Sequence, residues 1–402
     1  MDRRMGRKAM MRAFPAPEES QVTLLNWLTK PANEWAFRNV RQILPTANIR
    51  RPPYASPLSR AGRDLEEVRF DGFDGRPTTL LPVIKQLEID GLLVMHRGTV
   101  VWEYYDHGFA PSMQHIVFSV TKSITGVLAG ILAEAGKIDP DDAILKYLPE
   151  AKGTAYEAAR IRHLLDMAVG LHWEEDYVDP DGDVARYRRA CGWKVNPEGG
   201  LPSPHLREFL LSMRPNGGAH GDKFHYASPN TDLLGWILER ACGAAFAELV
   251  GQYIWAPLGA EDDAYVTLDA YGAARAAAGF CATLRDLGRF GEMMRNNGVS
   301  AGRQVVPRWW IDDIQNGGDA AAWAKGEFTK LFPEGNYRNK WYTPQRGRRA
   351  FCAIGVHGQY VYVDPEDETV IVRVSSQPVA FEVVNDRVWI RACRAIGERL
   401  RF

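Results

Sequence analysis

Runs of strand-forming residues stand near both ends of the 402-residue chain, and helical patterns fill the stretch between them. Near the first end, GLLVMHRGTVVWEYY (91–105) gives two β-rich runs joined at Arg97-Gly98, which predicts a hairpin. Near the second end, YVYV (360–363) and TVIVRV (369–374) flank the turn sequence DPEDE. Apolar residues recur at helical spacing from about residue 160 to 290 and again over 383–400. The pattern predicts an α+β fold, with a mostly helical insertion inside a body of strands and helices.

Three parts follow from this pattern. Residues 1–65 include the Pro-rich stretch 51–57, and we expect them to form an arm packed on the body. Residues 66–155 and 285–402 are expected to form one α/β domain, and residues 156–284 a mainly helical domain.

Composition narrows the classes of partner. The 49 Lys and Arg residues balance 50 Asp and Glu residues, so nothing indicates a nucleic-acid or acidic-membrane surface. The basic N-terminus meets Pro15, Pro17 and Glu18 where a signal peptide needs an apolar run, and no stretch of about 18 apolar residues occurs elsewhere. Five widely spaced cysteines without a CxxC pair argue against zinc and against a disulfide framework. We therefore expect a cytoplasmic protein with reduced thiols and a small-molecule partner, and a homodimer is left open as its assembly.

Ser119-Val120-Thr121-Lys122 opens a segment whose apolar residues recur at helical spacing. One helical turn places the side chains of Ser119 and Lys122 on the same face, where the amine can reach the hydroxyl. A lysine activates a serine if burial lowers the pKa of its amine. A single Ser-x-x-Lys is equally well explained by an N-capping serine and a solvated lysine.

Two further features favour catalysis over that bland interpretation. Tyr226 lies just before a helix start at Asn230, where its phenol is placed to pass a proton to a leaving group, although any amphipathic tyrosine suits a helix entry. The sequence 355–359, GVHGQ, precedes the strand YVYV and predicts an edge backbone that a substrate can approach closely. That edge would supply a second N–H beside the N–H of Ser119 for an oxyanion hole, although a glycine-rich hairpin entry would look the same.

Ser-x-x-Lys, Tyr-x-Ser and His-Gly-Gln, in this order, resemble the serine hydrolases related to class C β-lactamases and DD-peptidases. The segments NEWAF, EYYDHGFAP, SVTKS, EDYVDP, SPNTD, RDLGR, VHGQ and IVRVSS are similar to the 6-aminohexanoate-dimer hydrolases, the nylon-oligomer-degrading enzymes, over nearly the whole chain. This resemblance implies an antiparallel sheet flanked by helices, an all-helical domain and a cleft between them. It also implies an acyl-enzyme on Ser119, with Lys122 and Tyr226 as acid and base and the N–H groups of Ser119 and Val356 as oxyanion hole.

The resemblance implies substrate contacts as well. Tyr177 matches a tyrosine on a mobile loop that hydrogen-bonds the scissile amide nitrogen, and apolar pocket walls fall at Trp193, Phe328 and Tyr342. Core packing explains those three equally well. The amide-cleaving members have a carboxylate where this chain has Arg188 and an asparagine where it has Ala277. Because an arginine repels the ammonium group of a linear aminohexanoate dimer, short-chain esters are the expected substrates.

We therefore predict a cofactor-free serine hydrolase of small esters, and by extension amides, without a metal. An amidase for another amide is one alternative, and a non-catalytic penicillin-binding-like binding or sensor protein is another. The missing Lys-Thr-Gly motif argues against β-lactam chemistry. The alternating carboxylates of Asp179, Asp181 and Asp183 do not continue as an EF-hand, because Val184 and Ala190 stand where Gly and Glu are needed. We interpret that acidic stretch as a solvated loop.

Overall fold

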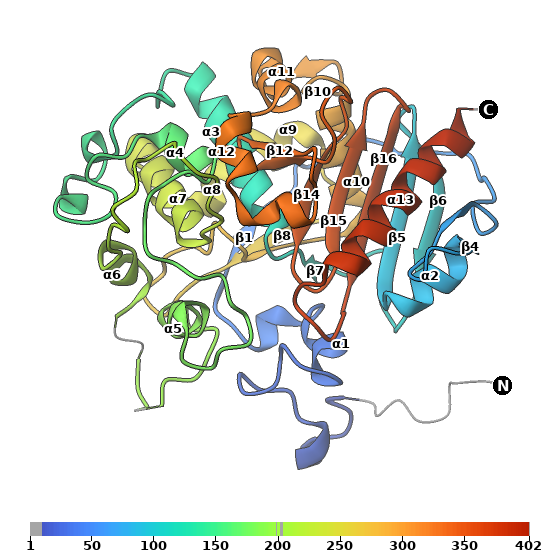
Figure 1. Cartoon of the computed structure of the whole chain (residues 1–402). Coiled ribbons are helices and arrows are strands. Elements are labelled where there is room, and N and C mark those ends of the chain that lie inside the picture. The colour runs from blue at the N-terminus through green and yellow to red at the C-terminus, as the bar shows by residue number, and fades with distance from the viewer. Residues whose placement is uncertain (1–9, 198, 202–203, 402) are drawn as a thin grey trace.

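The computed structural model describes residues 10–197, 199–201 and 204–401. Its largest element is an eight-stranded sheet, antiparallel except where β2 pairs with β6 (Figure 1). The pairing of β16 with β5 runs from Thr369 opposite His96 to Val374 opposite Gly91, and it joins the two ends of the chain. The strand order is β12 (Asn336–Arg338), β13 (Trp341–Thr343), β14 (Phe351–Gly355), β15 (Gln359–Asp364), β16 (Thr369–Ser375), β5 (Ile89–His96), β6 (Thr99–Tyr105) and β2 (Ser59–Arg60).

The two hairpins predicted from the sequence are present in this sheet. Between β5 and β6 the turn residues Arg97 and Gly98 have φ values of 52° and 76°, and two consecutive positive φ angles are typical of the tight type I′ turn. The second hairpin pairs β15 with β16, from Tyr360 opposite Arg373 to Asp364 opposite Thr369. Both hairpins follow from period-two patterns of β-branched and aromatic residues.

Helices cover both faces of the sheet because side chains alternate along each strand. On β5, Leu92 and Val94 pack in the same core cluster as α13 (Val383–Leu400) and α2 (Leu80–Gln86). Leu93 and Met95 point the other way, toward α10 (Leu284–Arg295) and α3 (Val120–Glu134). Figure 1 shows α13 in front of the sheet and α10 behind it.

The helical part of the chain lies beside this layered body (Figure 1). It contains α4 (Ile161–Leu165), α5 (Asp183–Ala190), α6 (Leu206–Leu211), α7 (Pro229–Cys242) and α8 (Phe246–Val250). A second sheet, of four strands, has the order β1 (Thr46–Ile49), β8 (Ala264–Thr267), β9 (Phe280–Ala282) and β7 (His115–Ile116). The first 65 residues supply β1 to this sheet and β2 to the larger one.

Shorter elements complete the described chain. The helices are α1 (Ala32–Ala36), α9 (Ala256–Leu258), α11 (Arg308–Asn316) and α12 (Ala320–Ala324), and two ribbons pair β3 (Arg69–Asp71) with β4 (Pro77–Thr79) and β10 (Val299–Ser300) with β11 (Arg303–Gln304). The α+β class expected from the sequence is confirmed. Within the described ranges, every helix is too short or too polar to cross a membrane. The five cysteines carry free thiols, and four of them are buried.

Candidate active site

Ser119 stands at the start of α3, directly after a sharp turn of the backbone. The preceding residue, Phe118, has a φ of 43°, a left-handed conformation that costs a non-glycine residue on the order of 1–3 kcal/mol. Aromatic packing holds this turn, with the Phe118 ring centroid 4.9 Å from Phe37 and 6.1 Å from Trp193. The strain therefore presents Ser119 at a fixed point between β7 and the helix.

Lys122 lies one turn further along α3 and reaches back to the serine. Its Nζ is 2.8 Å from Ser119 Oγ and 3.0 Å from the carbonyl oxygen of Ala277. The Ala277 peptide is itself fixed, because its N–H donates to Asp232 at 2.7 Å. Arg275 pairs with the same carboxylate at 2.7 Å. Ala277 therefore contributes its backbone carbonyl to the site.

The side chain of Lys122 is almost completely buried, with 1 % of its surface exposed. Burial lowers the pKa of its amine to about 8, and nearby Arg275 lowers it further, while Glu175 and Asp232 oppose the change. An amine with such a pKa is partly neutral near pH 7. In the neutral form it keeps one N–H for Ala277 and accepts the proton of Ser119, as a general base must.

Tyr226 brings a phenol to the same serine from the entry of α7. Its hydroxyl is within hydrogen-bonding reach of Ser119 and Tyr342, and Lys122 Nζ lies 5.1 Å from its ring centroid. Burial, with the charge of Glu175, raises the pKa of Tyr226 far above its ordinary value. The phenol of Tyr226 thus keeps its proton at neutral pH and can donate it, whereas the amine of Lys122 can accept one.

The end of β14 approaches the serine closely because residue 355 is a glycine. A Cβ at Gly355 would lie 2.4 Å from the carbonyl oxygen of Val117 and 3.1 Å from the backbone nitrogen of Ser119. This contact brings the backbone of Val356 beside that of Ser119, as an oxyanion hole requires. β14 is an interior strand of the sheet, but it pairs with β13 only at Tyr342 opposite Cys352, so in the described chain no strand lies beside Gly355 on that side and the expected edge backbone is present locally. His357 Nδ1 donates to the carbonyl oxygen of Gln377 at 2.7 Å.

Glu175 is a component of the site that the sequence analysis missed. Its carboxylate accepts hydrogen bonds from Trp173 Nε1 at 2.5 Å and from Tyr177 OH at 2.7 Å. It also accepts from Ser228, at 2.5 Å from Oγ and 3.1 Å from the backbone nitrogen. Ser228 is the third residue of the Tyr-x-Ser motif, which the sequence analysis singled out. Glu175 belongs to the same acidic stretch as Asp179, for which the sequence predicts a solvated loop. Its partners tie this loop to the residues beside Tyr226.

One cavity adjoins the nucleophile. Its lining includes Ser119, Val356, Glu175, Tyr177 and Arg188, together with Phe118, Val184, Tyr187, Trp193, Ser228, Arg275 and Ala278. Its volume is about 30 Å³, which is room for a water molecule but not for a substrate. The structure thus brings the predicted Tyr177, Arg188 and Trp193 together with the nucleophile around one small cavity.

The other predicted contacts lie around Tyr226. The ring centroid of Phe328 is 5.2 Å from that of Tyr226 and 5.6 Å from that of Tyr342. Phe328 and Tyr342 pack against Tyr226 and do not line the cavity that contains Arg188. The side chain of Ala277 is buried, and its neighbour Ala278 lines the cavity instead.

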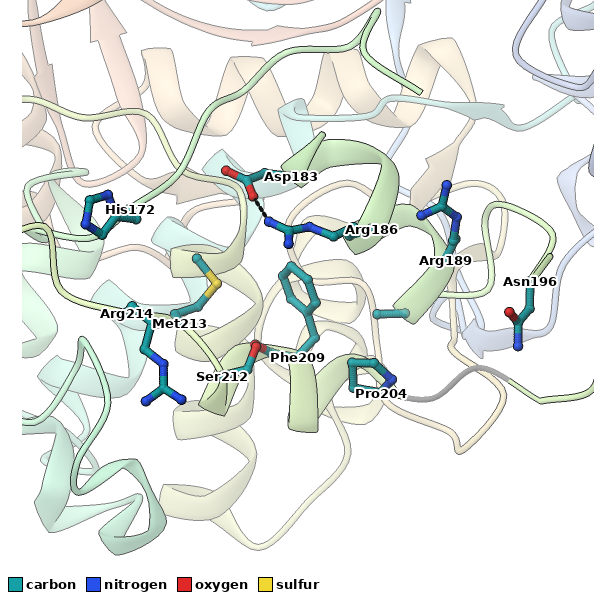
Figure 2. Close-up of a pocket in the computed structure, with 11 residues that line it drawn as sticks. His172, Asp183, Arg186, Arg189, Asn196, Pro204, Phe209, Ser212, Met213 and Arg214 are labelled. Carbon is teal, nitrogen blue, oxygen red and sulfur yellow. Dashed lines mark hydrogen bonds and ion pairs between the residues drawn. The ribbon is translucent and has the colours of Figure 1, made fainter. Parts of the chain in front are cut away.

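A much larger cavity, of about 470 Å³, lies between α5 and α6 (Figure 2). It contains Arg186, Arg189 and Arg214, and its lining includes neither Ser119 nor Lys122. Arg186 is ion-paired with Asp183, and Arg189 with Asp181 at 3.2 Å. We call this the outer groove, and the cavity beside Ser119 the inner cavity.

Comparisons with known proteins agree with this geometry. Residues 85–393 match the family described as Beta-lactamase. A 6-aminohexanoate-dimer hydrolase of Paenarthrobacter ureafaciens is 36% identical over 365 residues, or 91% of each chain. A solved structure of a candidate 6-aminohexanoate-dimer hydrolase from Bacillus anthracis superposes with a TM-score of 0.86 at 27% identity, covering 96% of this chain and 99% of that one. A class C beta lactamase of Rhodobacter sphaeroides shares the fold, with a TM-score of 0.57 at 16% identity over 78% and 97% of the two chains.

Proposed function

The chain belongs to the beta-lactamase family and is a serine hydrolase, and from that premise we propose that it cleaves small esters and amides through an acyl-enzyme on Ser119. The observation that carries the proposal is the 2.8 Å contact between Lys122 Nζ and Ser119 Oγ, made by a lysine whose pKa burial lowers to about 8. A base already in contact with a hydroxyl is what a serine nucleophile needs.

Acylation uses three side chains. The neutral amine of Lys122 takes the proton of Ser119 as Oγ forms a bond to the substrate's carbonyl carbon. Negative charge then develops on the carbonyl oxygen, which the N–H groups of Ser119 and Val356 would stabilise. As the carbonyl re-forms, the bond to the leaving group breaks and Tyr226, whose hydroxyl is in reach of Ser119, gives its proton to that group; the proton held by Lys122 then restores the phenol.

Deacylation repeats these steps with water in place of the serine. A water that enters beside Ser119 from the inner cavity attacks the acyl carbon as it loses a proton to Lys122, which contacts the serine oxygen. The bond to Ser119 breaks, the serine regains its proton, and the acid is released. The volume of about 30 Å³ suits the water, while entry of a substrate requires movement of the loop that carries Tyr177.

We propose esters as the better substrates. The similar protein from Paenarthrobacter ureafaciens is named for hydrolysis of the 6-aminohexanoate dimer. The linear form of that dimer carries an ammonium group. Arg188 in the inner cavity would repel that group, so the dimer should be a poor substrate here. Tyr177 OH donates its proton to Glu175 at 2.7 Å, so its oxygen is left to accept from the N–H of a scissile amide, which keeps amides within the proposed range.

The setting of the reaction is also a proposal. We place the enzyme in the cytoplasm, with a small-molecule substrate and with neither nucleic acid nor membrane as a partner. The near balance of 49 basic and 50 acidic residues and the free thiols support this assignment. A homodimer is the assembly to examine by light scattering.

The test is hydrolysis of p-nitrophenyl acetate and butyrate, with 6-aminohexanoate dimer as a second substrate. Wild-type protein is compared with Ser119→Ala and Lys122→Ala, and with Lys137→Ala, an exposed lysine just beyond the same helix, as control. We expect both site variants to lose esterase activity and the control to keep it. Activity that survives in Ser119→Ala would refute the nucleophile. An inert wild type whose serine becomes acylated and stays so, by mass spectrometry, would support a sensor instead.

A further inference from the structure

The inner cavity contains an arginine that makes no ion pair in the described chain. Arg188 is partly buried and lines this cavity with Ser119 and Val356. Its backbone is fixed at the end of α5, where its carbonyl oxygen accepts from Trp193 N at 2.8 Å and Lys194 N at 3.2 Å. The only contact of its guanidinium that we find in the described chain is with the Tyr177 ring, 5.4 Å from the ring centroid. Its five N–H donors therefore have no carboxylate partner there.

The acids near Arg188 are engaged elsewhere. Glu175 accepts four hydrogen bonds, from Trp173, Tyr177 and Ser228, and makes no ion pair with Arg188. Asp232 is held by Arg275 at 2.7 Å and by Ala277 N. Burial lowers the pKa of Arg188 and the nearby charge of Glu175 opposes that change without direct contact, although a guanidinium stays charged at any ordinary pH.

The other two arginines of α5 each have an acidic partner, so among the three arginines of this helix only Arg188 lacks one in the described chain. Arg186, two residues earlier, is 61% exposed at its side chain and is paired with Asp183. Arg189 faces the outer groove and is paired with Asp181. Both neighbouring arginines thus have acidic partners, while the one beside the nucleophile has none in the described chain. A partly buried cation without a direct ion pair is costly, and a bound anion would offset that cost.

We propose that Arg188 binds a carboxylate of the substrate, so that the enzyme prefers esters or amides that carry a negative charge beyond the scissile bond. This inference rests on the proposed hydrolysis at Ser119 and adds the charge of the substrate. A guanidinium binds a carboxylate through two parallel N–H donors, which gives orientation as well as affinity. Two kinds of substrate carry such a carboxylate: a half-ester of a dicarboxylic acid and an acylated amino acid.

The experiment compares substrates that differ only in charge. On the acyl side, the mono-4-nitrophenyl ester of adipic acid is compared with the 4-nitrophenyl ester of adipic monoamide. On the leaving-group side, 4-acetoxybenzoate is compared with 4-acetoxybenzamide. We expect wild-type kcat/KM to favour the anion by about tenfold or more in one pair, the scale of a charge-assisted hydrogen bond, and the pair that responds identifies the half that carries the carboxylate.

Variants of α5 then assign the preference to one side chain. Arg188→Gln should bring the ratio near one while neutral esters are still cleaved, and Arg188→Glu should invert it. Arg186→Gln, on the exposed face of the same helix, should leave the ratio unchanged. A wild-type ratio of one or less in both pairs, or a preference that survives Arg188→Gln, would overturn the inference. Neutral-ester turnover in the same assays reports separately on the proposed function.

Binding provides a readout that does not need turnover. Adipic monoamide, an anion, and adipamide, its neutral counterpart, are titrated by calorimetry into Ser119→Ala protein. Tighter binding of the anion that disappears in Ser119→Ala/Arg188→Gln supports the inference even if no ester is hydrolysed. Equal binding of the two ligands counts against it.

Discussion

The inner cavity and the outer groove lie on two sides of α5, and they use similar side chains in opposite ways. The outer groove is about 470 Å³ in volume and the inner cavity about 30 Å³. Each contains a serine and at least one arginine. In the groove, Ser212 Oγ donates to the carbonyl oxygen of Phe209 at 2.7 Å, and Arg186 is paired with Asp183. Size alone would have selected the wrong cavity.

What separates the two cavities is the surroundings of these side chains. Ser119 has a base at 2.8 Å whose pKa is lowered by burial, whereas Ser212 hydrogen-bonds one turn of its own helix. A reactive serine therefore depends on a buried amine and on the strained turn at Phe118, which the groove does not offer. The comparison predicts which substitutions will matter.

The largest effect is expected from the two serines. Ser119→Ala should lower kcat for p-nitrophenyl butyrate by about 10⁴-fold or more, because no other group can form the acyl-enzyme. Ser212→Ala, in the outer groove, should change it by less than about twofold, since it removes only a local hydrogen bond. Steady-state kinetics of both variants measure this difference. Comparable losses in the two would show that the groove takes part in catalysis.

The next effect is the pH dependence that Lys122 imposes. Burial lowers the pKa of this amine to about 8, and only its neutral form accepts a proton, so kcat/KM should rise with pH up to about 8 and then level off. Lys122→Ala should lose about 10²–10⁴-fold and, with it, this ascending limb. The measurement is a pH series from 5 to about 10 with a neutral ester. A limb that persists in Lys122→Ala would assign the titration to another group.

A smaller loss is expected at Gly355. Gly355→Ala places a Cβ 2.4 Å from Val117 O and forces β14 away from Ser119, which separates the two N–H donors of the proposed oxyanion hole. Loss of one such donor costs about 10²–10³-fold in kcat. Gly62→Ala is the matched control, because nothing lies within 4 Å of a Cβ built there. If KM rises while kcat stays constant, the glycine serves binding and not the transition state.

Local patterns in the sequence predicted much of this site and fold. The three-residue spacing of Ser119 and Lys122, the helix over 383–400 and the two hairpins depend on neighbours along the chain, and the structure has all of them. The assignment of roles to Tyr226 and Val356 came from the family resemblance, and no local pattern distinguishes them from an ordinary tyrosine or valine.

Features that depend on long-range packing were not predictable in this way. β14 lies inside the sheet because β13 pairs with it, and the pairing of β16 with β5 joins strands from the two ends of the chain; no local pattern predicts either contact. Glu175 stands among solvated acids in the sequence, and its role appears only when Ser228, 53 residues away, donates to it. The lack of an acidic partner for Arg188 likewise reflects the whole cavity.

The smallest effect is expected from Glu175, whose charge acts on the base of the inner cavity. Its negative charge opposes the lowering of the Lys122 pKa, so Glu175→Gln should lower that pKa further and move the ascending limb of kcat/KM to lower pH. The exposed neighbour Glu174 is the control: Glu174→Gln should leave the limb in place, because solvent screens its charge. A purely structural role for Glu175 would reduce kcat at every pH without moving the limb. The direction of the shift therefore tests whether this carboxylate acts on Lys122 through its charge, in addition to holding the Tyr177 loop against Ser228.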